Sequence, residues 1–184
     1  MRQIFYKYKW ILIFIAAFLV IGRAEAINLQ SWDRVINRPQ RFQVLPQFSN
    51  EAVLDRETQL VWEQQPVSEP PFSSTRNWSD AVFVCYSKHV GGRYGWRLPT
   101  LEELASLMDP ETPITEPALP SGHPFSNVQG HFYWSATTKT DAPNEAMGVH
   151  FALRAIVSLD KTMGTSGNAE VWCVRGGHGY DGGH

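Results

Sequence analysis

Oxygen-bearing side chains are concentrated in one short segment of the chain, Asp141-Ala142-Pro143-Asn144-Glu145. Asp141, Asn144 and Glu145 would supply carboxylate and amide oxygens, which are the ligands that a hard cation such as Ca²⁺ prefers. A second ligand-bearing segment is present only as a loose match at 168–172. The segment is therefore a candidate calcium site, with an ordinary polar loop as the alternative, and calcium is the only cofactor that this segment suggests.

A second candidate metal site lies in the glycine-rich tail, where His178, Asp181 and His184 are spaced three residues apart. Imidazoles together with a carboxylate could hold zinc, copper or nickel. The alternative is a flexible tail with incidental metal affinity.

The familiar catalytic patterns are missing from the sequence. Ser135 is not surrounded by the G-x-S-x-G turn of a hydrolase nucleophile, and the chain contains no H-E-x-x-H zinc motif. The adjacent acids Glu102 and Glu103 lie at the expected start of a helix, where capping explains them. We therefore expect a protein without enzymatic activity.

The N-terminus has the organisation of a signal peptide. Arg2, Lys7 and Lys9 form a basic region, Trp10 to Ile21 is an apolar run, and Ala24-Glu25-Ala26 is a small-x-small cleavage site. The run is shorter than the roughly 20 residues that a membrane span needs. We expect cleavage after Ala26; the alternative is an uncleaved anchor, which the aromatic residues before the run would extend.

Charge and length narrow the function classes. Residues 1–26 hold four of the 16 basic residues and one of the 18 acidic residues, so the remainder has a net charge of −5. This balance argues against a nucleic-acid partner, because phosphates attract a basic surface. The remaining chain is long enough for one domain with a sizeable core, and no further membrane span is expected.

Cys85 and Cys173 are the only cysteines. An even pair in an exported chain predicts one disulfide, which would close a loop of almost ninety residues. A redox or catalytic thiol is the alternative, but the spacing is not C-x-x-C and both cysteines lie among apolar residues. We therefore expect a structural role for the pair.

Two helices are expected in the first half of the domain. Asn77 would cap a helix that ends at Gly91-Gly92, and Thr100 with Glu103 would form the capping box of a second helix that Asp109-Pro110 ends. In the first helix, residues recur at helical spacing at Trp78, Ala81, Val82, Cys85, Tyr86 and His89.

Short strands are expected on both sides of the helices. The strand-like runs are 41–45, 52–55, 59–62, 132–136, 148–153, 155–159 and 170–174. Residues 52–62 read as a hairpin with its turn at 56–58, and the proline-rich segment 109–130 reads as a long loop that is either functional or disordered. The pattern by itself indicates the α+β class.

Five motifs carry a resemblance to a known family. They are D-R-E-T-Q-L-V-W at 55–62, N-W-S-D-A-V-F-V-C at 77–85, G-W-R-L-P-T-L-E-E-L at 95–104, F-Y-W-S-A at 132–136 and V-W-C-V-R-G-G at 171–177. In order and wording they resemble the C-terminal domain family of the Legionella collagen-like adhesin, which is related to C-type-lectin-like folds. No Gly-X-Y tract precedes the motifs here, so collagen-driven trimerisation is not implied.

The resemblance implies a C-type-lectin-like domain, with two helices packed on short, mainly antiparallel strands and one disulfide. It implies domain bounds of 51–177, after a signal peptide (1–26) and an N-terminal extension (27–50) and before a Gly/His-rich tail (178–184). Fold-building side chains are expected at Trp62, Trp78, Trp96, Arg97, Pro99, Trp134, Trp172 and Arg175. Arg97 is expected to pair with Glu103 or Asp55.

The resemblance also implies a binding function. We expect an exported, periplasmic or cell-surface module that recognises a surface glycan or another cell-envelope macromolecule. The loops 109–130 and 138–147 are the expected binding site, with Phe125 as an exposed aromatic platform, Tyr180 in the tail as another, and Arg154 and Lys161 as local cations. A structural envelope protein that docks onto a partner protein is the alternative, and an enzyme of unfamiliar type is a third.

Overall fold

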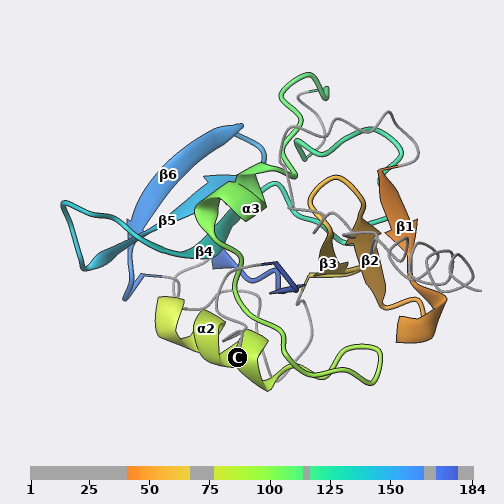
Figure 1. The fold of residues 1–184 in the computed structure, drawn as a ribbon. Helices are drawn as coiled ribbons and strands as arrows, with labels where there is room; N and C mark the ends of the chain where they lie inside the picture. The colour runs from red at the N-terminus through yellow and green to blue at the C-terminus, as the bar shows by residue number, and fades with distance from the viewer. Residues whose placement is uncertain (1–40, 67–76, 114–116, 164–168, 178–184) are drawn as a thin grey trace, which may run out of the picture.

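The computed structural model describes residues 41–66, 77–113, 117–163 and 169–177, which form two sheets and two helices (Figure 1). The expected signal peptide, residues 27–40 of the expected extension, and the tail with His178, Tyr180, Asp181 and His184 lie outside the described residues. Within the described ranges, none of the helices has the length and apolar character to cross a membrane.

The first sheet gathers strands from both ends of the domain. β1 (Phe42–Val44), β2 (Ala52–Asp55), β3 (Leu60–Glu63) and β8 (Val174–Arg175) form it in the order β1-β2-β3-β8, and all its pairs are antiparallel. A short 3₁₀ helix, η1 (Pro46–Phe48), follows β1. The hairpin predicted at 52–62 is confirmed. β1 comes from the segment expected to be an extension, but its pairing with β2 makes it part of the folded unit.

The second sheet has the order β6-β5-β4-β7. β4 (Phe132–Thr138), β5 (Glu145–His150) and β6 (Ala155–Asp160) are antiparallel neighbours, and β7 (Ala169–Glu170) pairs with β4 in parallel. β5 begins and ends three residues before the run expected at 148–153. Residues 151–154 form the turn to β6, so the apolar Phe151 marks the turn and not the strand centre.

The strand expected at 170–174 is divided into two pieces. Glu170 pairs with β4 in the second sheet, whereas Val174 pairs with Trp62 of β3 in the first. The chain crosses from one sheet to the other at 171–173, and these three residues are outside both ladders.

Both predicted helices are present, and both end earlier than predicted. In α2 (Trp78–Ser87) the Asn77 side chain accepts from the backbone N–H of Asp80, as expected for its cap. In α3 (Leu101–Ala105) Thr100 and Glu103 form the complete predicted capping box. The second sheet lies between α2 and α3, as Figure 1 shows.

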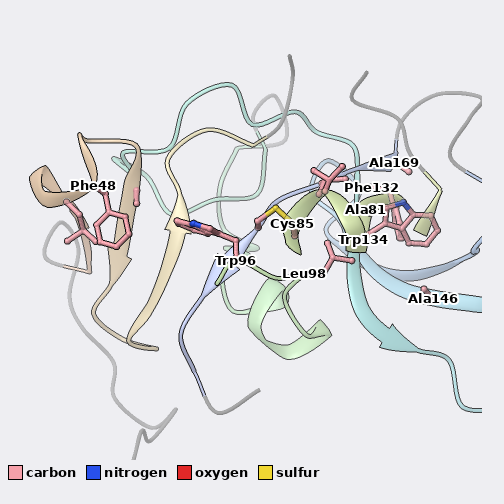
Figure 2. Close-up of a cluster of buried hydrophobic side chains, with 14 residues drawn as sticks. Phe48, Ala81, Cys85, Trp96, Leu98, Phe132, Trp134, Ala146 and Ala169 are labelled. Atoms are coloured by element: carbon pink, nitrogen blue, oxygen red, sulfur yellow. A yellow bond between two sulfur atoms is a disulfide. The ribbon is translucent and has the colours of Figure 1, made fainter. Parts of the chain in front are cut away.

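The first core cluster lies on the α2 side of the second sheet (Figure 2). Alternate residues of β4, Phe132 and Trp134, point into it and pack edge to face, with ring centroids 4.9 Å apart. The cluster continues to the first sheet through Trp96, which packs edge to face on Phe48. Its remaining buried members are Leu45, Ala52, Ala81, Val84, Cys85, Leu98, Ala146, Ala169, Val171 and Cys173.

The second cluster lies on the α3 side and is centred on Trp172. The rings of Trp62, Phe125, Tyr133 and Phe151 surround it at centroid distances between 4.9 and 6.1 Å. Leu104 and Leu107 from α3 and the following turn complete this side. The tryptophans expected in the core are therefore there: Trp62, Trp96, Trp134 and Trp172 are buried, and Trp78 is half-buried, its indole N–H donating to the Ser135 carbonyl.

The predicted disulfide joins Cys85 of α2 to Cys173 in the crossing between the sheets. It spans 88 residues and joins α2 to the segment that connects the two sheets. A cross-link of this span restricts the unfolded chain strongly, because loop-closure entropy increases with the length of the loop.

Replacing both cysteines, Cys85→Ala with Cys173→Ala, should lower the free energy of unfolding by about 2–5 kcal/mol, because the unfolded chain regains the entropy of the closed loop. Urea unfolding of oxidised wild type, reduced wild type and the double variant measures the effect. Reduced wild type should behave like the variant. An oxidised protein no more stable than the reduced one would show that the bond contributes nothing to stability.

Candidate functional site

Arg97, in the strongest motif of the sequence, forms a bidentate ion pair with Glu103. Its two terminal nitrogens lie 2.7 and 2.8 Å from the Glu103 carboxylate oxygens, and Nη2 also donates to the Gly176 carbonyl at 2.6 Å. Of the two expected partners, Glu103 is confirmed. Asp55 pairs instead with Arg41, at 2.8 Å.

The Glu103 carboxylate has a second task, because Oε2 also accepts from the backbone N–H of Thr100 at 2.8 Å. One carboxylate therefore both caps α3 and holds Arg97. Gly177 packs against this pair with a positive φ, and a Cβ there would lie 3.1 Å from Glu103 Oε1 and 2.8 Å from Leu60. We call Arg97, Glu103 and the Gly176–Gly177 backbone the arginine clasp. Its surroundings are occupied by protein, so its role is to build the fold.

Two further signature residues also make backbone contacts. Arg175 Nε donates to the Tyr94 carbonyl at 2.8 Å, which fixes β8 to the loop before Trp96. Pro99 is buried, and its carbonyl accepts from the backbone N–H of Ala136 at 2.7 Å. Both residues therefore hold the motif against the sheets.

Two other buried acids are also bound by structural partners. Glu63 pairs with Lys88 and accepts from the backbone N–H of Cys173 at 2.8 Å. Glu170 lies 3.0 Å from Nδ1 of His131. Burial raises the pKa of both carboxyl groups above the ordinary value, although Lys88 and His131 oppose the shift.

The candidate calcium segment closes the β4–β5 hairpin. Glu145 accepts from Ser158 at 2.6 Å and from Lys139 at 3.0 Å, and Asn144 donates to Asp160 at 3.1 Å. Asp141 is exposed, 3.9 Å from Lys139. In the described ranges, no three side chains of the types His, Cys, Asp or Glu come together as a metal would require. The oxygens of this segment are used to hold the hairpin.

Phe125 was expected to be an exposed platform, and that prediction is wrong. Its side chain is 6% exposed and lies edge to face on Trp172 and Phe42, with centroids 4.9 and 5.1 Å away. The proline-rich loop turns inward here because its few apolar side chains complete the second cluster. Ala118 and Leu119 of the same loop are buried too.

Arg154 and Lys161, the expected local cations, are engaged in internal contacts. Arg154 Nη2 donates to the carbonyls of Thr112 and Pro113 at 2.6 and 2.8 Å. Lys161 Nζ donates to Thr138 and Pro143, both at 2.9 Å, and lies 4.5 Å from the centroid of the Trp78 ring. Arg154 therefore contacts the 112–113 segment, whereas Lys161 contacts the candidate calcium segment at Pro143. They fasten loops to the second sheet.

In the described ranges, the exposed aromatic rings lie on α2 and on the turn that follows it. Phe83, Tyr86 and Tyr94 are 67%, 78% and 67% exposed, and the Tyr94 ring stacks on His89 at 4.3 Å. We call Phe83, Tyr86, His89 and Tyr94 the α2 aromatic surface. On α2, Phe83 and Tyr86 are three residues apart and share the solvent face with Val82, opposite Ala81, Val84 and Cys85.

The sequence pattern missed this surface. Residues 81–86 are apolar or aromatic on every side of the helix, so helical spacing alone did not select the buried face. The residues that recur at helical spacing in the sequence include Val82 and Tyr86, and both lie on the exposed face of α2. The usable signal was Cys85: its disulfide must point inward, which turns Phe83 and Tyr86 outward.

Breaking the arginine clasp should destabilise the fold strongly. Glu103→Ala removes one of the two hydrogen bonds of the capping box and leaves a largely buried guanidinium without its carboxylate, so we expect a loss of about 3–5 kcal/mol. Glu102→Ala, one position earlier on the exposed side of α3, is the matched control and should change stability by less than about 0.5 kcal/mol. Chemical denaturation compares them; equal losses would refute the clasp.

The buried Glu170 should give stability a distinctive pH dependence. Its folded pKa is raised above 4.5, so at pH values between 4.5 and the folded pKa the folded chain keeps a proton that the unfolded chain has lost. The free energy of unfolding of wild type, relative to Glu170→Gln, should therefore fall as pH rises through that range, by about 1.4 kcal/mol per unit of pKa shift.

Glu145→Gln is the control with the opposite sign. The Ser158 hydroxyl and then Lys139 lower the pKa of Glu145, so wild type should gain on this variant as pH rises through the folded pKa towards 4.5. Denaturation curves between about pH 3 and 8 test both. Parallel curves for wild type and Glu170→Gln would contradict the assignment.

The comparison with family models agrees with the resemblance noted in the sequence. The model described as the Lcl C-terminal domain matches residues 51–175. These bounds include α2, α3, the disulfide and both partners of the Arg97–Glu103 pair. A search of curated proteins gives no match. Because the family model covers more than half of the chain, the protein belongs to the Lcl C-terminal domain family.

Proposed function

We propose that the protein is an exported, non-enzymatic recognition module that binds glycans through the α2 aromatic surface. The observation that carries the proposal is the exposure of three aromatic rings within twelve residues, whereas most of the other aromatic rings among the described residues are buried. Several exposed aromatic groups close together in the chain favour an interaction site, because a ligand that covers them gains the free energy of burying them. Membership of an adhesin-associated domain family supports the same reading.

The chemistry of the surface suits a sugar. The flat faces of Phe83, Tyr86 and Tyr94 offer apolar contact to the C–H face of a pyranose, and the tyrosine hydroxyls and the His89 ring offer hydrogen bonds. The chain carries a formal net charge of −2, and −5 without residues 1–26, which favours neutral glycans over polyanionic ones.

A non-enzymatic role is supported by how the buried acids are used. Asp55, Glu63, Glu103 and Glu170 each have a basic partner that fixes an element of the fold. Catalysis by a carboxyl group needs access to a substrate, and these groups face internal partners. We further propose a C-type-lectin-like fold, with β1 included in the folded unit, on the strength of the motif resemblance and of the disulfide that joins α2 to the crossing between the sheets.

Export to the periplasm or the cell surface is part of the same proposal. A disulfide persists in oxidising compartments, and the basic–apolar–small order of residues 1–26 is typical of a signal peptide. Both features would serve a protein that meets its ligand outside the cytoplasm.

A partner protein in the cell envelope is the second candidate ligand. Val82 lies beside Phe83 on the exposed face of α2, and together with Tyr86 they form an apolar stripe of the kind that docks onto another protein. Hydrophobic contact with Val82 and Phe83 would dominate in that case, whereas a sugar would depend on Tyr94 and His89.

A glycan array probed with the oxidised protein tests the proposal. We expect saturable binding to one class of neutral glycan, weakened at least tenfold by Tyr94→Ala. Leu153→Ala is the matched control, because Leu153 is equally exposed (66%) but lies in the β5–β6 turn, and it should bind as wild type does. A folded protein that binds no glycan would reject the glycan proposal, and envelope pull-down with Val82→Asp as the control would then test the partner protein.

A further inference from the structure

β6 is an edge of the second sheet, and Figure 1 shows it as the outermost strand there. It has six residues, compared with three in β1 and two each in β7 and β8, the other strands that end a sheet. β6 is therefore the longest open edge in the described part of the chain. An open edge presents unpaired N–H and C=O groups that can pair with another strand.

The hydrogen bonds of β5 fix which groups of β6 face outward. Phe151 N–H donates to the His131 carbonyl at 3.1 Å, and Lys161 N–H donates to the Asn144 carbonyl at 2.8 Å. Since bonding direction alternates along an antiparallel strand, the odd-numbered residues of β6 bond to β5. Ile156, Ser158 and Asp160 therefore direct their backbone groups away from the sheet. The Asp160 carbonyl accepts from Met163, which leaves Ile156 and Ser158 without backbone partners among the described residues.

Among the described residues, the edge lacks three common forms of protection. Natural edge strands are blunted by proline, lysine or a bulge, and the segment Ala155-Ile156-Val157-Ser158-Leu159 contains neither residue and pairs with β5 in unbroken register. Ile156 is 48% exposed. An apolar edge that is kept open in this way suits a defined strand partner.

We propose that β6 pairs with β6 of a second copy of this chain, antiparallel about a two-fold axis at Val157. The charges at the ends of the strand choose this direction: Arg154 precedes β6 and Asp160 ends it, so antiparallel pairing sets opposite charges together at both ends, and parallel pairing would set like charges together.

The proposed register satisfies the open backbone groups and extends the core. Ile156 of each copy becomes the hydrogen-bonded neighbour of Ser158 in the other copy, so the two-fold axis generates two such pairs. Val157 faces its own counterpart as a closely spaced, non-hydrogen-bonded pair. Val157 and Leu159 are half-buried against the first core cluster, so two such clusters would meet across the axis. The result is one continuous sheet through both copies, whatever ligand each copy binds.

Sedimentation of the purified oxidised protein tests the proposal. We expect a concentration-dependent dimer that Ser158→Pro weakens at least tenfold, because proline removes an outward N–H while leaving the bonds to β5 intact. Ser158→Ala is the matched control: it removes the hydroxyl that donates to Glu145 and should dimerise as wild type does. A protein that stays monomeric up to about 0.5 mM, where ΔG° of association is above about −4.5 kcal/mol, would overturn the proposal.

Cross-linking distinguishes this register from any other dimer and does not depend on the proline variant. Val157→Cys should form a disulfide between copies on mild oxidation, because side chains of a non-hydrogen-bonded pair lie close enough. Ala155→Cys, on the same face but opposite Leu159 of the other copy, should remain uncross-linked. Cross-linking of Ala155→Cys but not Val157→Cys, or a dimer insensitive to Ser158→Pro, would overturn the proposal, as would capture of a foreign extended peptide by a monomeric chain.

Discussion

The fold depends on one largely buried ion pair, between Arg97 and Glu103. This pair can form only when the loop before α3, α3 itself and the last strand lie together. The backbone of Arg97 exchanges two hydrogen bonds with Val174, at 2.9 Å each, so the arginine is held at both its backbone and its side chain. A largely buried charge is tolerated only when it is paired and hydrogen-bonded. That requirement fixes where the loop before α3, α3 itself and the last strand must lie relative to one another.

The crossing at 171–173, together with Val174 of β8, contributes side chains to both core clusters. Val171 and Cys173 point into the first cluster, and Trp172 and Val174 point into the second. Alternation in an extended segment gives this result without a regular strand. The disulfide fixes one side of the segment, and the largest aromatic ring of the second cluster fixes the other. Glu63 completes the arrangement by accepting from the Cys173 N–H, which the crossing leaves outside both ladders.

Contacts between residues close in sequence made much of the fold predictable. Contacts between residues distant in sequence explain most of the predictions that were wrong. The caps at Asn77 and Thr100 depend on residues three positions away, so the sequence contains everything that they need. The Arg97–Glu103 pair was predictable for the same reason, as the two residues are six apart. The parallel pairing of β7 with β4 joins residues almost forty positions apart, and no pattern in Ala169–Glu170 predicts it.

The candidate site was the least predictable part. Phe125 is buried because Trp172 and Phe42, both distant in sequence, leave space for its ring. Phe83 and Tyr86 are exposed because α2 has more apolar surface than one sheet face covers. Polarity alone suggested the 141–145 segment as a site, but its neighbours in β6 and the hairpin use its oxygens internally. Which side of an apolar helix or loop is buried is decided by the whole structure.

The bond between Cys85 and Cys173 encloses the end of α2, all of α3, the proline-rich loop and the second sheet within one covalent ring. A protease that cuts the chain once anywhere inside this ring makes two fragments that stay tethered to each other. The cut protein keeps its mass, apart from one added water, and keeps its packed clusters as neighbours. A single cut in an exposed loop inside this ring therefore changes the apparent mass of the protein only after the disulfide is reduced.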